Sequence, residues 1–122
     1  MNDLQQEIDA KAVAPRIKPT DIEDNIVSET YFTAADGFAW ANQCTLEDEH
    51  PLHLLTFCVL TLRNGFTVTG ESACASPENF DAEIGQKVAR ENAINKMWPL
   101  MGYELKGRLY RIEQLRKEVG AA

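Results

Sequence analysis

Two groups of side chains in this sequence have types that could perform chemistry. The first is Cys44, His50 and His53, which offer the thiolate and imidazole ligands that zinc prefers. Their spacing matches no zinc-binding pattern, and a fourth ligand would have to come from Cys58, Cys74 or a carboxylate. We therefore interpret them as two loop histidines and a scattered thiol, and we predict neither a metal site nor a cofactor.

The second group consists of carboxylates at a predicted junction between a strand and a helix. Its four members are Glu71, Glu78, Asp81 and Glu83. Two carboxylates can divide acid and base roles when their environments differ, but negative charge is favoured in the first turn of any helix. Neither a nucleophile motif nor a phosphate-binding glycine loop accompanies the cluster. The sequence thus predicts a protein that is not an enzyme and has no catalytic residue.

A basic surface is a third candidate, and phosphate groups would be its ligands. Five cationic side chains fall on the last predicted helix: Lys106, Arg108, Arg111, Arg116 and Lys117. Arg90 and Lys96 could extend this surface. Glu104, Glu113 and Glu118 alternate with the basic residues, so the pattern favours the solvated face of an amphipathic helix over a nucleic-acid surface.

Composition limits the remaining classes of function. The 122 residues fit one domain, and the net charge of −7 argues against a general affinity for polyphosphates. No apolar run is long enough to cross a membrane, and the acidic start is unlike a signal peptide. The three cysteines, an odd number, are typical of reduced thiols in a cytosolic protein.

The clearest element is a β-hairpin at about 54–73. Two β-prone runs flank Asn64-Gly65, a dipeptide that favours a two-residue type I′ turn. Such a turn pairs Thr61 with Val68 and leaves neither face of the hairpin plainly polar. We therefore expect helices to cover one face, and the N-terminal segment or a second subunit to cover the other. The predicted interface consists of Phe57, Val59, Phe66, Val68 and Trp40.

Two helices are expected after the hairpin, at about 76–98 and 103–118. Ser76-Pro77-Glu78 has the residues of a helix start. A four-residue repeat of Phe80, Ile84 and Val88 predicts the buried side, which is extended by Ala89, Ala93, Ile94, Met97 and Trp98. Pro99 is predicted to end the first helix. The second helix has an apolar side formed by Leu105, Leu109, Ile112, Leu115 and Val119.

The N-terminal half gives weaker signals. Residues 1–19 predict a mobile arm with a short helix near Leu4–Val13, and residues 20–122 a single α+β domain. Thr20 and Glu23 have the spacing of a capping box for another short helix, and residues 28–33 favour a strand. Residues 34–53 show no clean period and predict a long loop with one helical turn.

Three stretches of the C-terminal half resemble a known family. They are Cys58–Ala73, Ser76–Gly85 and Trp98–Leu105. Together they are similar to a family of small tailed-phage proteins named for gene product forty-nine of phage N-four and gene product sixty-six of phage Sf-six, over about residues 54–109. The resemblance implies a phage or prophage origin and action in the cytoplasm of the bacterial host, and it implies no particular activity.

From these observations we expect a non-enzymatic phage accessory protein, homodimeric, that binds a host protein or factor, with the countering of host defence as one such role. Two alternatives stay open: a sponge for a signalling nucleotide, and a nucleic-acid-binding accessory protein that uses the basic last helix.

Overall fold

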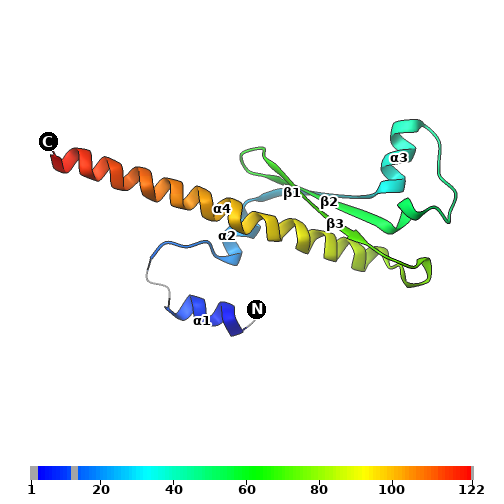
Figure 1. Cartoon of the computed structure of the whole chain (residues 1–122), viewed down its shortest axis with the longest axis horizontal. Helices are drawn as coiled ribbons and strands as arrows, with labels where there is room; N and C mark the ends of the chain where they lie inside the picture. The colour runs from blue at the N-terminus through cyan, green and yellow to red at the C-terminus, as the bar shows by residue number, and fades with distance from the viewer. Residues whose placement is uncertain (1–2, 12–13, 122) are drawn as a thin grey trace.

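The structure, a computed structural model, describes residues 3–11 and 14–121. A three-stranded antiparallel sheet in the order β1-β2-β3 packs one face on a long C-terminal helix, which extends well past the sheet (Figure 1). In chain order the helices and strands are α1 (Asp3–Lys11), α2 (Pro19–Asp24), β1 (Ile26–Thr33), α3 (Ala34–Asn42), β2 (Leu55–Leu62), β3 (Thr67–Ala73) and α4 (Ala82–Ala121). This arrangement confirms the predicted α+β class. No helix of the described residues is both long enough and apolar enough to cross a bilayer.

The hairpin exists where it was predicted, but its register differs by one residue. Leu62 donates its amide to the carbonyl of Phe66 at 2.8 Å, so three residues form the loop. Only Gly65 in this loop has a positive φ, of 89°, as a three-residue hairpin loop requires. The side chain of Asn64 accepts the amide of Phe66 at 2.9 Å and stabilises the turn. The predicted two-residue turn is therefore wrong.

This shift decides which side chains are buried. Val68 pairs with Leu60 and Thr67 with Thr61, so each β3 side chain points to the face opposite to the predicted one. Buried and partly exposed residues alternate strictly along β2. The buried ones, which face the helix, are Thr56, Cys58, Leu60 and Leu62. With the correct register one face is apolar and the other is rich in threonine, as expected for a sheet that is covered on one side.

The two predicted C-terminal helices are one continuous helix, α4, with Pro99 inside it. Pro99 cannot donate to the carbonyl of Asn95, but both residues are exposed, so water can satisfy that carbonyl. The prediction that Pro99 ends the helix is wrong. The predicted start is also wrong, because Ser76 precedes a short 3-10 turn, Pro77–Asn79. Asp81 caps α4 instead, its side chain accepting the amide of Ile84 at 3.0 Å.

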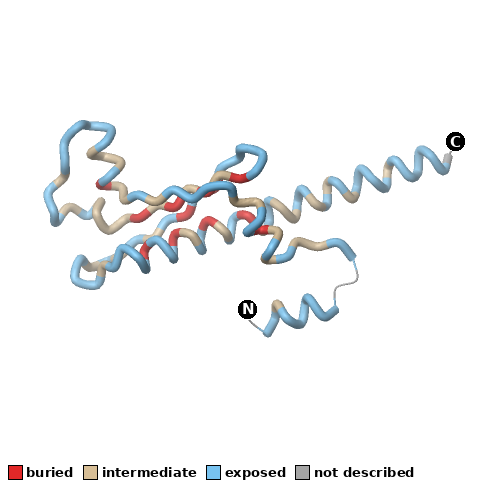
Figure 2. The backbone as a smooth tube through the Cα atoms, turned by 180° about the vertical axis from the view of Figure 1, so that it is seen from behind, coloured by how far each residue is buried: buried red, intermediate tan, exposed pale blue. Residues whose placement is uncertain are grey.

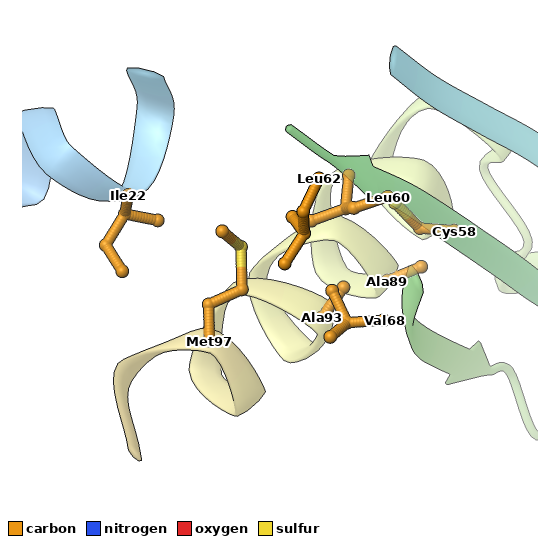
Figure 3. Close-up of a cluster of buried hydrophobic side chains, with 8 residues drawn as sticks. All are labelled: Ile22, Cys58, Leu60, Leu62, Val68, Ala89, Ala93 and Met97. Atoms are coloured by element: carbon orange, nitrogen blue, oxygen red, sulfur yellow. The ribbon is translucent and has the colours of Figure 1, made fainter. Parts of the chain in front are cut away.

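Helix α4 meets the sheet through small residues at four-residue spacing, which are Gly85, Ala89 and Ala93, followed by Met97. Of the predicted buried side, Ala89, Ala93 and Met97 are confirmed, whereas Ile84 is 59% exposed and Val88 is 43% exposed. Close approach explains the difference: a Cβ on Gly70 would overlap backbone atoms of Ala89 and Ala93. Only small side chains fit where the helix lies directly on β3. Figure 2 shows this buried line along α4, and Figure 3 shows the core side chains around it.

The core joins α2 to this layer. Ile22 of α2 is fully buried together with Leu60 and Met97 (Figure 3). The cap of α2 is Lys18, whose amide donates to Asp21 at 2.8 Å, so the predicted capping box of Thr20 and Glu23 is wrong. Because α2 packs on the α4 side, the described N-terminal residues do not cover the second face of the sheet, which was one of the two expected covers. The predicted end of the first helix at Val13 lies outside the described residues.

Residues 34–42 form helix α3 rather than a loop. Thr33 and Asp36 make a capping box, with the Asp36 amide donating to Thr33 Oγ1 at 3.1 Å and the Thr33 amide donating to Asp36 at 2.9 Å. Asp36-Gly37 is a dipeptide typical of turns, but Asp36 here completes the capping box of a helix. A short 3-10 helix follows at Pro51–Leu54, so a long loop with one helical turn underestimates the helix in this segment.

Candidate binding surfaces

The open face of the sheet is the face that α4 does not cover. Phe57 and Val59 lie on it, opposite Phe32 and Thr30 of β1. The rings of Phe32 and Phe57 are 5.5 Å apart and tilted by 31°. Beside them Trp40 of α3 is 89% exposed. This end of the face therefore carries an exposed aromatic group, whereas its middle is mostly threonine.

The structure does not bring the five residues of the predicted interface together. Phe57 and Val59 lie on the open face, and Trp40 lies beside Phe32, which contacts Phe57. Val68 is buried beneath α4, and Phe66 lies beside α4 at the hairpin loop. The difference follows directly from the one-residue change of register.

The second surface is the projecting half of α4, which we define as residues 103–121 (Figures 1 and 2). Its apolar side, named here the apolar stripe, consists of Leu105, Leu109, Ile112, Leu115 and Val119. Leu115 is 60% exposed, and Val119 is more exposed still. Among the described residues, no other element lies against the outer part of this stripe.

The five basic residues of the predicted binding surface point to different sides of α4. Arg108 lines a groove near the N-terminal segment, Arg111 lines a hollow near the hairpin loop, and Arg116 lies beside the apolar stripe. Lys106 and Lys117 share another side by helical periodicity. A single phosphate-binding face formed by all five is therefore not present in the described structure.

Arg90 lies in an ion-pair cluster that joins α2, β1 and α4. It donates to Glu23 at 2.7 Å and to Glu29 at 3.0 Å, while Tyr31 donates its hydroxyl to Glu29 at 2.6 Å. The Arg90 hydrogen bond lowers the pKa of Glu29, and the two carboxylates raise the pKa of Arg90. Burial is the main cause of the raised pKa values of Tyr31 and of the neighbouring Cys58 thiol. This cluster holds elements together and leaves Arg90 little capacity for a phosphate.

The candidate metal ligands are used locally. The ring of His50 accepts the amide of Leu52 at 3.2 Å, and Nε2 of His53 lies 2.9 Å from the carbonyl of Glu47. Cys44 is exposed. No group of three or more potential ligands among the described residues is arranged to hold a metal ion.

The four candidate carboxylates are also separated. Asp81 caps α4, and Glu83 pairs with Lys87 one turn later at 3.4 Å. Glu71 lies on the open face of the sheet. Glu78 is exposed in the 3-10 turn before α4.

Two adjoining hollows where the hairpin loop meets α4 were not anticipated from the sequence. The polar groove, of about 630 Å³, collects four cations from separate segments: Arg16, Lys18, Arg63 and Arg108. The aromatic hollow, of about 320 Å³, includes Phe66 and Tyr103. Of the four groove cations only Arg108 belonged to a predicted site, whereas Phe66 and Arg111 of the aromatic hollow belonged to two different predicted sites. No local pattern could have revealed the other groove cations, because the fold alone brings positions 16, 63 and 108 together.

Comparison with known families supports and extends the resemblance seen in the sequence. The family model described as Phage protein (N4 Gp49/phage Sf6 gene 66) family matches residues 17–109, which is more than half of the chain. The match begins before α2 and includes all three strands, so it reaches further toward the N-terminus than the similarity at 54–109. Searches of curated proteins and of solved structures gave no significant match. The chain belongs to the phage N4 Gp49/phage Sf6 gene 66 family.

Proposed function

We propose that this phage protein has no catalytic activity and acts by binding a protein of the infected bacterium through the projecting half of α4. The observation that supports this proposal is the apolar stripe, which the rest of the described chain leaves largely uncovered. Contiguous exposed apolar surface on a small protein commonly marks a site of interaction.

The length of the projecting half adds to this argument. A helix without tertiary packing is marginal in water even at some 12–15 residues, because most helix stability in proteins comes from packing an apolar side. Here the sheet supports only the first half of α4. A binding partner would supply for the second half the packing that the sheet supplies for the first.

The spacing of the stripe fits packing against another helix. Leu105, Ile112 and Val119 recur every seven residues, as in helices that pack along their length, and the repeat continues back to Trp98. Leu109 and Leu115 widen the stripe between these positions. The surface therefore suits a helical partner better than an extended peptide.

The charges on the same side indicate the chemistry of the partner. Arg108 and Arg116 interrupt the stripe, and Arg111 borders it. Glu104 approaches Arg108 only at 3.8 Å, so this cation is weakly paired. Carboxylates at matching positions of a partner would satisfy these groups and fix its register. We therefore expect an amphipathic helix with an acidic border.

The test uses two variants of α4, each of which replaces an exposed apolar side chain by glutamate. Leu115→Glu places a charge in the stripe, and Ile84→Glu places one on a flank of α4 over the sheet. The two side chains are 60% and 59% exposed, so neither change removes core packing. Tagged wild-type and variant proteins are purified from infected bacteria, and the host proteins that co-purify are identified. Each such host protein is then purified, and its dissociation constant from the wild type and from each variant is measured.

A host protein that binds the pure wild type and Ile84→Glu, but binds Leu115→Glu at least about tenfold more weakly, supports the proposal, since one charge in an apolar contact costs more than 1.4 kcal/mol. Equal binding of both variants contradicts it. Light scattering of the pure protein tests whether a second copy of this chain, rather than a host protein, packs on the stripe. A dimer that only Leu115→Glu dissociates would assign the stripe to a second copy of this chain.

A further inference from the structure

We propose that the polar groove and the aromatic hollow together form a nucleotide-binding site, with the phosphate in the groove and the base in the hollow. This inference goes beyond the proposed function, because it concerns a different surface and a small ligand. It is carried by the cations of the groove, by a buried guanidinium nitrogen without a partner, and by exposed aromatic rings in the adjoining hollow.

The groove contains more positive charge than its own ion pairs use. Among the described residues, the side chains of Lys18 and Arg63 make no ion pair, and Arg108 reaches Glu104 only at 3.8 Å. Cations from separate segments around one concave site are a common arrangement for phosphate recognition. A phosphate would give each of these side chains a partner.

Arg16 supplies a second, independent observation. Its Nη2 atom lies 2.8 Å from Asp9, but its Nη1 atom is buried and has no hydrogen-bond partner among the described residues. Buried donors without partners are rare in folded proteins, because each such group costs free energy. Because Nη1 is buried, the Arg16 side chain, which lines the groove, would have to turn toward it to give this donor a phosphate acceptor.

Three carboxylates also line the groove, and two of them are already engaged. Asp21 accepts the amide of Lys18 at 2.8 Å, and Glu104 is the partner of Arg108. All three carboxylates, Asp24 included, keep their negative charge and oppose an anion in the groove. Four cations and three acids line the groove, and Asp9 pairs with Arg16 beside it, so the groove is close to neutral on a protein whose overall charge is −7.

Asn25 holds the walls of both hollows in place. Its backbone carbonyl accepts the amide of Arg63 at 3.1 Å, and its side-chain amide lies 3.5 Å from the sulfur of Met101. These contacts join the end of α2, the hairpin loop and α4. Because the frame is fixed before a ligand arrives, little ordering would be needed on binding.

The aromatic hollow begins where the groove ends, since both include Asn25, Asn64, Met101 and Glu104. Phe66 and Tyr103 line it and are 54% and 83% exposed, so a ligand can reach both side chains. Aromatic side chains are the usual stacking partners of nucleobases. An anion site that adjoins a stacking site matches a ligand with a phosphate at one end and a planar ring at the other.

Calorimetric titration of the full chain at low salt tests the assignment. The probes are AMP, GMP, CMP and UMP, together with adenosine, inorganic phosphate and a short single-stranded oligonucleotide. Arg63→Gln removes a groove cation but keeps the backbone amide that Asn25 binds, and Tyr103→Ala removes an exposed ring. Lys117→Gln and Tyr110→Ala are matched controls on α4 outside both hollows. Circular dichroism confirms that each variant is folded.

We expect at least one mononucleotide to bind more tightly than inorganic phosphate or adenosine. Arg63→Gln and Tyr103→Ala should each weaken it about tenfold or more, and the controls less than about twofold, on the scale measured for base stacking and charged hydrogen bonds. The same dependence with the oligonucleotide, but without mononucleotide binding, would support the site with a nucleic-acid strand as its ligand. Absence of binding to every probe, or binding that neither variant weakens, would overturn the proposal.

Discussion

Gly70→Ala tests the most demanding contact of the fold. A Cβ at this position would lie 2.9 Å from the Cα of Ala93, and it would be closer still to the carbonyl oxygen of Ala89 and the amide nitrogen of Ala93. Ordinary van der Waals contact begins at about 3.4 Å. All three obstructing atoms belong to the helix backbone, so no side-chain rotation can relieve the overlap.

The helix would have to move away from β3, and the resulting gap determines the cost. A displacement of about 0.5–1 Å forfeits a quarter to a half of the dispersion energy of each contact it opens. The contacts concerned include Leu60, Val68 and Met97, at the centre of the core (Figure 3). Overpacking of a core usually costs about 1–3 kcal/mol, and since rigid backbone is involved here we expect about 3 kcal/mol or more.

Urea unfolding followed by far-ultraviolet circular dichroism measures this change, with Gly102→Ala as the control. Nothing lies within 4 Å of a Cβ at Gly102, which is also part of α4. Alanine there should stabilise the helix by about 0.5–1 kcal/mol. If Gly70→Ala were as stable as the wild type to within about 0.5 kcal/mol, a margin that surface substitutions rarely exceed, the close approach of α4 to β3 would be refuted.

Two further predictions concern the hairpin loop and the ion-pair cluster. Gly65→Val should destabilise the protein by about 1–2 kcal/mol in urea unfolding, because the φ of 89° at Gly65 is unfavourable for a β-branched residue; an unchanged midpoint would contradict the loop geometry. The pKa of Glu29 is lowered from its usual 4.5, so its ionised form stabilises the fold fully above pH 4.5, and this contribution is lost as the pH falls further. Glu29→Gln should therefore show a smaller loss of urea midpoint between pH 7 and pH 3 than the wild type, and equal losses would exclude the pairing with Arg90.

The hairpin shows how much of the fold the sequence can define. Asn64-Gly65 and the flanking β-prone runs placed both strands correctly, because these signals are local. Loop length was not determined, since an Asn-Gly pair fits both a two-residue turn and the last two positions of a three-residue loop. The choice depends on which face of β3 meets the helix, and Val68 and Gly70 fit beneath α4 only in the observed register.

The wrong predictions for α4 have a similar cause, since tertiary packing overrides the local sequence signals there. Pro99 is normally a strong signal for the end of a helix, but packing of Met97 and Met101 on either side holds α4 continuous through it. Ile84 and Val88 gave the strongest apolar period and are exposed, because close approach selects side-chain size over hydrophobicity. The groove cations were missed for a related reason: a site assembled from three distant segments has no signature in any one of them.

The two halves of α4 differ in the size and the exposure of their apolar side chains, and this difference supports a binding role for the second half. The first half has small residues at the contact with the sheet, namely Gly85, Ala89 and Ala93. They bury less apolar surface than large side chains would, but they allow the helix to lie directly on the sheet. In the second half, Leu115 and Val119 present large apolar side chains where no described element meets them. If the second half were only a solvated extension, small side chains there would expose less apolar surface to water than leucine and valine do, at a lower cost in free energy. The size of these side chains is explained if another helix packs against them, and Leu115→Glu is therefore the substitution that separates a partner-binding surface from a passive helix end.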